Sequence, residues 1–156
     1  MGPKTLRGFT VIELVTCVIV LALLAALAGP RFVGTQSFDQ LGYAHELSAA
    51  LRYAEGVAVA TGCNVQVTIT VAGYSAQQRA LAAGNTCAAA GAYTTQVVRA
   101  DGSPLTGTPP TDANVAAGGT IVFGPTGGVA NPPAPALVIG SFTLSLDAVS
   151  GFVTVQ

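Results

Sequence analysis

The chain has 156 residues, of which 51% are hydrophobic and only 8% are charged, with a formal net charge of −1 at pH 7. This length corresponds to one small domain, and the charge content is low for a soluble protein of that size. Six basic residues among 156 do not form the cationic clusters that polyanion binding requires, so nucleic acid is not a favoured partner.

The first expected element is an apolar helix near the start of the chain. Between Phe9 and Gly29 the only charged residue is Glu13. At about 1.5 Å per residue, roughly 20 helical residues match a hydrocarbon core of about 30 Å, so this segment is long enough to span a membrane. Lys4 and Arg7 precede it, which favours a cytoplasmic N-terminus and an exported body. We therefore expect a single-pass membrane protein.

Two other kinds of N-terminal signal could contain such a segment. A removable secretory signal is the main alternative, because residues 26–28 (Ala-Leu-Ala) match the small-residue cleavage pattern. Glu13 argues against it, since a carboxylate near the start of such a segment costs insertion energy without any benefit. A lipoprotein signal fits poorly because Cys17 precedes most of the apolar run, and we expect Cys17 to be a packing residue.

The stretch Gly8-Phe9-Thr10-Val11-Ile12-Glu13-Leu14 resembles the class III signal of type IV pilins and type II secretion pseudopilins. In that signal a short basic leader ends in Gly and is followed by Phe, a carboxylate at the fifth mature position and an unbroken apolar helix. The resemblance implies that residues 1–8 are a leader, that a prepilin peptidase cuts between Gly8 and Phe9, and that the new Phe9 amine is methylated. It also implies that residues 9–30 form a helix for both membrane insertion and assembly.

Glu13 then has a physical explanation. A carboxylate isolated in lipid costs roughly 2.5–3.5 kcal/mol, which indicates a functional residue with a partner. In a filament, the Phe9 amine of one subunit can pair with Glu13 of its neighbour, and this pairing makes assembly selective. Pro30 lies at the twenty-second mature position, where this family commonly has a kink, and it removes a backbone donor from the helix.

A second helix is expected over residues 31–60. Apolar residues recur there largely at three- and four-residue steps, which predicts one packed face. The residues expected on that face are Phe38, Leu41, Leu47, Leu51, Ala54 and Ala58. His45 on the same stretch is expected to be a surface or packing residue.

A β-sheet is expected over residues 64–156. Residues 64–71 alternate polar and β-branched side chains, which predicts a strand with one buried face, and residues 74–78 can return as its hairpin partner. Further strands are expected at 95–99, 120–123, 137–139, 141–146 and 152–155, the last two as a hairpin. The Gly- and Pro-rich segments between them are expected to be exposed connections. The predicted fold class is α+β, with a long N-terminal helix packed on a mostly antiparallel sheet.

The body carries a narrower resemblance. Residues 46–78, ELSAALRYAEGVAVATGCNVQVTITVAGYSAQQ, resemble the GspH/FimT-type minor pilins. Within that group, residues 36–67, followed by a second Cys and a closing Thr/Ser-Gly-aromatic-Val strand, resemble the minor pilins of the mannose-sensitive haemagglutinin (MSHA) pilus. From residue 88 to residue 135 the resemblance is weak. It implies a type IV pilin fold, an inner-membrane subunit with a periplasmic body (31–156) before assembly, and a place in the extracellular pilus fibre afterwards.

The same resemblance implies a set of partners. They are the prepilin peptidase, the major pilin, other minor pilins and the inner membrane. The expected role is initiation or capping of the fibre at its tip. Alternatives are a GspH-like pseudopilin of a type II secretion system, and a tip adhesin whose loops 100–118 and 124–136 contact a surface or glycan. A DNA-uptake pilin is not favoured, because loss of the leader leaves four basic residues against seven acidic ones.

Cys63 and Cys87 both lie in the exported body, in an oxidising compartment, and we expect a disulfide between them worth on the order of 3 kcal/mol. Two thiols and the distant His45 do not make a metal site. The sequence has no nucleophile elbow and no phosphate-binding loop, so it predicts no catalytic residue, no cofactor and no enzyme activity.

Overall fold

The computed structural model describes residues 10–28, 35–82, 86–88, 90–132 and 134–156. The chain divides into two compact units, Met1–Thr35 and Gln36–Gln156. Gly8, Phe9 and Pro30 lie outside the described residues, so the expected cleavage site, methylation site and kink are not tested by the structure.

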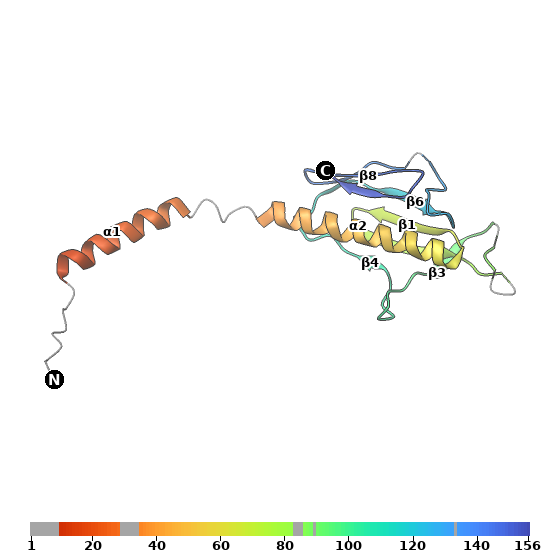
Figure 1. The fold of residues 1–156 in the computed structure, drawn as a ribbon, viewed down its shortest axis with the longest axis horizontal. Coiled ribbons are helices and arrows are strands. Elements are labelled where there is room, and N and C mark those ends of the chain that lie inside the picture. Colours follow the sequence, from red (N-terminus) through yellow and green to blue (C-terminus); the bar gives the residue numbers. More distant parts are fainter. Residues whose placement is uncertain (1–9, 29–34, 83–85, 89, 133) are drawn as a thin grey trace, which may run out of the picture. The chain divides into compact units, whose positions relative to one another are not determined.

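The first unit contains helix α1, Val11–Ala28 (Figure 1). Thr10 caps it: the backbone N–H of Glu13 donates to the Thr10 carbonyl oxygen at 3.1 Å and to Thr10 Oγ1 at 3.4 Å. Across the described ranges, no helix combines the length and the hydropathy needed to cross a membrane. Residues 9, 29 and 30 of the expected span 9–30 lie outside those ranges.

Helix α2, Thr35–Thr61, belongs to the second unit from Gln36 onward (Figure 1). Its buried face consists of Tyr43, Ala44, Leu47, Ser48, Ala50, Leu51, Ala54 and Ala58. Two residues expected on that face are not buried: Phe38 is 77% exposed and Leu41 is half-buried. Figure 1 shows the start of α2 extending beyond the labelled strands.

The strands form two antiparallel sheets instead of the single sheet expected. The first has the order β3-β2-β1-β6, with β4 also paired to β2. Its strands are β1 (Val65–Thr70), β2 (Gly73–Arg79), β3 (Tyr93–Gln96), β4 (Thr106–Gly107) and β6 (Gly119–Phe123). The second sheet has the order β5-β7-β8-β9. Its strands are β5 (Val115–Ala117), β7 (Leu137–Ile139), β8 (Phe142–Leu146) and β9 (Val153–Val155).

One hydrophobic core joins α2 to both sheets. Val65, Val67 and Ile69 contribute from β1, while Ile139 and Leu144 contribute from the second sheet. Alternate residues of β1 are buried, as the period-two pattern predicts. The β1–β2 and β8–β9 pairs are antiparallel hairpins, as expected. The fold is therefore α+β, with a helix packed on antiparallel sheets.

The loops expected to be exposed supply part of this core. Leu105, Val115 and Val129 are all less than 10% exposed. Leu105 is held against the first sheet, because its N–H donates to the Val97 carbonyl at 2.8 Å and its own carbonyl accepts from the Ala76 N–H at 3.1 Å. The expectation of exposed connections was wrong at these positions, since the segments close the edges of the sheets.

Candidate functional site

Glu13 lies in the first turn of α1, three residues after the cap Thr10. Thr-x-x-Glu is the capping-box pattern, and a carboxylate there also interacts favourably with the positive end of the helix dipole. The Glu13 carboxylate makes no hydrogen bond or ion pair with any residue that the structure describes. Glu13 therefore lies where it can stabilise the start of the helix, and its charge has no partner among the described residues.

The apolar side chains of α1 are exposed on every side of the helix. Between Val11 and Leu24 the large hydrophobic residues are 44% to 82% exposed. The single hydroxyl in this run is satisfied locally, since Thr16 Oγ1 donates to the carbonyl oxygens of Ile12 (3.0 Å) and Glu13 (2.9 Å). A helix surface of this kind is stable when apolar groups cover it.

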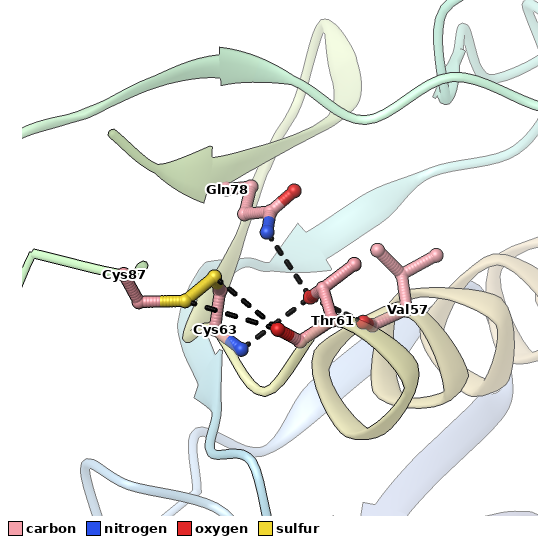
Figure 2. Close-up of a disulfide and its surroundings, with 5 residues drawn as sticks. All are labelled: Val57, Thr61, Cys63, Gln78 and Cys87. Carbon is pink, nitrogen blue, oxygen red and sulfur yellow. Dashed lines mark hydrogen bonds between the residues drawn. A yellow bond between two sulfur atoms is a disulfide. The ribbon is translucent and has the colours of Figure 1, made fainter. Parts of the chain in front are cut away.

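The expected Cys63–Cys87 disulfide is present in the body (Figure 2). Cys63 follows the end of α2 and is buried, and Cys87 belongs to the connection between β2 and β3. The two Cα atoms are 5.4 Å apart. The bridge therefore fixes the base of that connection to the C-terminal end of the helix. Cys17, on α1, is a free and exposed thiol.

Thr61 organises the environment of the disulfide (Figure 2). Its hydroxyl donates to the Val57 carbonyl at 2.7 Å, and it accepts from the Gln78 amide at 3.0 Å and the Cys63 N–H at 3.4 Å. Its carbonyl oxygen lies 3.6 Å and 3.9 Å from the two sulfur atoms. These are contacts rather than hydrogen bonds, because a disulfide sulfur carries no hydrogen. Sequence reasoning did not identify this role of Thr61.

A polar network links α2 to the segment after β3. The Tyr74 hydroxyl donates to Glu46 Oε1 at 2.9 Å and accepts from Arg99 Nη2 at 3.4 Å. Arg99 also donates to the carbonyl oxygens of Pro104 (2.6 Å) and Thr106 (2.9 Å). Burial, reinforced by the Glu46 carboxylate and opposed by Arg99, raises the pKa of Tyr74 to about 12. At neutral pH this tyrosine is a hydrogen-bond donor and not a base.

This network lines a pocket of about 290 Å³ between α2 and the segment after β3. The lining residues are Glu46, Ala49, Ala50, Tyr53, Tyr74, Arg99 and Leu105. The pocket is mostly apolar, and the guanidinium of Arg99 is occupied by two backbone carbonyls of its own loop. We assign Arg99 to holding that loop in place.

The other described cations also serve the fold. Arg52 donates to the Val153 carbonyl at 2.9 Å and lies 5.2 Å from the Phe152 ring centroid. Arg79 donates to the Tyr93 hydroxyl at 3.1 Å and lies 5.2 Å from that ring centroid. His45 is exposed on α2, and within the described ranges no group of three His, Cys, Asp or Glu residues could hold a metal ion.

Comparison with known families gives a match for the body. Residues 43–156 match the family described as type II transport protein GspH, from the buried part of α2 through both sheets. The match covers more than half of the chain. Neither the curated proteins nor the solved structures contain a match.

Proposed function

Because the chain belongs to the GspH family of type II transport proteins, we propose that it is a structural minor pilin or pseudopilin that joins other pilins in a fibre. The observation that carries this proposal is that the apolar residues of α1 are exposed on all sides, whereas the body has its own core. Such a helix is suited to a lipid bilayer before assembly and to the packed interior of a fibre afterwards.

The processing of the chain follows from its N-terminal signal. In our proposal a prepilin peptidase removes residues 1–8 by cutting between Gly8 and Phe9, and the Phe9 amine is then methylated. Residues 9–30 cross the inner membrane and carry a kink at Pro30, and residues 31–156 form the periplasmic body. The free carboxylate of Glu13 then meets the Phe9 amine of a neighbouring subunit.

Within this class we favour a C-type minor pilin of an MSHA-like type IV pilus, which initiates or caps the fibre at its tip. The resemblance of residues 36–67, the second cysteine and the closing strand to that group supports this role. A GspH-like pseudopilin of a type II secretion system is the second candidate, and the description of the matching family favours it. Loss of surface fibres on deletion, with secretion intact, would support the pilus role, and the reverse result would support the pseudopilus.

A structural role requires no catalytic or cofactor-binding residue in the body. We propose that the protein is not an enzyme and uses no cofactor. Four arginines remain after processing, and three of them already serve the fold: Arg52 and Arg79 lie over aromatic rings, and Arg99 holds a loop. They do not favour nucleic acid as a partner.

Mass spectrometry of the N-terminus from the native host tests the proposal. The mature chain should begin with a methylated Phe9, and the unprocessed chain should accumulate when the prepilin peptidase is deleted. A mature chain that begins after Ala28, or a lipid on Cys17, would contradict the proposed processing.

A further inference from the structure

The outer face of the first sheet, on the side opposite α2, carries two rows of neutral hydrogen-bonding side chains. Directly paired residues of neighbouring strands share a face, so the register defines each row. The first row crosses β6, β1, β2 and β4 and consists of Thr120, Thr68, Ser75 and Thr106. The second crosses β1, β2 and β3 and consists of Gln66, Gln77 and Gln96. At about 4.8 Å per strand, the first row is roughly 14 Å long.

These seven side chains have no hydrogen-bond partner within the described part of the chain. They are exposed or half-buried, and each hydroxyl or amide can both donate and accept. Side chains elsewhere in the body are used differently: the Asn131 amide, for example, bonds to the backbone of β6 on both its oxygen and its nitrogen. The two rows therefore present unused donors and acceptors in a fixed, flat array.

The same face has very little charge. Among all the strands described, the only charged residue is Arg79, which is engaged with Tyr93 at one end of the face. At the opposite end, a groove of about 400 Å³ continues the first row. Thr68, Thr70, Ser75, Thr106 and Thr108 line it with hydroxyls.

The chemistry of this face selects among possible ligands. Nucleic acid requires clustered cations, and this face offers one occupied arginine. A stable protein partner requires large apolar or aromatic anchors, and none of the exposed large hydrophobic residues belongs to β1, β2, β3, β4 or β6. A neutral chain that carries its own hydroxyls matches the face in both charge and hydrogen bonding.

We propose that the outer face of the first sheet binds an extended, uncharged polysaccharide. The chain lies along the hydroxyl and glutamine rows, with a sugar ring seated in the groove at the β1–β2 turn. This inference rests on the proposed function only in that a body carried on an external fibre can reach a polysaccharide surface. It places the contact on the sheet and not on the loop 124–136, and the segment 100–118 contributes through Thr106 and Thr108 beside the groove.

The test uses the full-length chain purified in detergent micelles, on beads carrying cellulose, chitin or mannan, with bare beads and heparin beads for comparison. We expect retention on at least one neutral polysaccharide that does not fall when salt is added, because the contacts are uncharged. The double variant Ser75→Ala/Gln77→Ala should bind more weakly by roughly two- to tenfold for each side chain removed. The matched control Thr143→Ala/Ser145→Ala removes exposed side chains of β8, in the second sheet, and should leave retention unchanged.

Both Ser75 and Gln77 are exposed, so the double variant should keep the melting temperature of the wild type. If it does not, Gln77→Glu keeps the shape of the side chain, removes its donor, and should still weaken retention. The proposal is overturned if no neutral polysaccharide retains the chain, if heparin retains it in a salt-dependent manner instead, or if the control pair weakens retention equally. Binding is measured on purified protein, so it does not depend on cleavage or assembly, which the N-terminal mass spectrometry tests separately.

Discussion

The hydroxyl of Tyr74 connects α2 to the segment that follows β3. It donates to Glu46 and accepts from Arg99, and its burial raises its pKa from 10.0 to about 12. A folded-state pKa above the unfolded value means that the folded state holds the proton more tightly. The stability from this group is therefore complete below about pH 10 and is lost as the pH rises towards 12.

Replacing Tyr74 by Phe tests this connection. Tyr74→Phe should lower the free energy of unfolding by about 1 kcal/mol at neutral pH, because two hydrogen bonds to partners near the surface are lost. It should also reduce the fall in stability between pH 10 and pH 12, while Tyr43, whose pKa burial also raises, keeps its share. Urea unfolding across this pH range measures both effects. Tyr53→Phe, which removes a single bond to the Val98 carbonyl, is the control and should leave the alkaline fall intact.

The elements that sequence patterns predicted are those whose own residues determine their burial. In β1 every second residue enters the core, so the alternation from Val65 to Thr70 was sufficient to locate the strand and its hairpin partner. Leu105 and Val115 lie among Gly and Pro residues without any alternation, and they are buried only because distant strands lie beside them. Short strands that depend on tertiary pairing leave no periodic signal in the sequence.

The candidate sites also differ in whether the sequence could predict them. The disulfide could be predicted because only two cysteines lie in the exported body. The network of Glu46, Tyr74 and Arg99 could not, because its members are 28 and 25 residues apart and have no motif in common.

Asn131 shows how a loop residue can complete a strand edge. Its side-chain oxygen accepts from the Val122 N–H at 2.7 Å, and its nitrogen donates to the Thr120 carbonyl at 2.9 Å. Asn131→Ala should cost about 1–2 kcal/mol of unfolding free energy, because the β6 backbone loses both partners. Asn114→Ala is the matched control, and should change stability by less than about 0.5 kcal/mol, because its bonds to Gly140 and Asp112 use the backbone. Equal effects in chemical denaturation would show that the Asn131 amide does not support the sheet.

The disulfide acts at the junction of a helix and a sheet. Cys63 and Cys87 are 24 positions apart, and closing a loop of that length contributes about 3 kcal/mol by restricting the unfolded chain. Cys63→Ala/Cys87→Ala should therefore lower the free energy of unfolding by about this amount. Adding reductant should bring the wild-type protein to a similar value and leave the variant unchanged. If reduction does not alter the wild-type denaturation midpoint, the bridge does not contribute to stability.

At the scale of the whole molecule, the two units differ in the burial of their apolar residues. The body, residues 36–156, buries its apolar residues in one core and keeps neutral polar residues on the outer face of its first sheet. The helix α1 leaves its apolar residues exposed and carries one free carboxylate near its start. The body can therefore be complete as a folded unit, while in our proposal α1 gains its partners on assembly.

The clearest test of that division is Glu13→Val. Val suits a bilayer better than a carboxylate does, so cleavage and membrane insertion should remain normal. Recovery of the subunit in sheared fibres should fall sharply, because the Phe9 amine of the neighbour loses its partner. For a minor subunit that starts each fibre, the number of fibres should fall more than their length. Electron microscopy gives the fibre count, and immunoblots of membrane and fibre fractions follow the subunit.

Glu13 also lies in the capping turn, so a second variant must separate its two roles. Thr10→Ala removes the cap hydroxyl, which costs about 1 kcal/mol of helix stability, and leaves the carboxylate in place. If the charge of Glu13 drives assembly, Thr10→Ala should enter fibres nearly as well as the wild-type chain, while Glu13→Val should not. If both variants lose incorporation equally, the start of the helix and not the charge is the requirement. If Glu13→Val enters fibres normally, the carboxylate has no role in assembly.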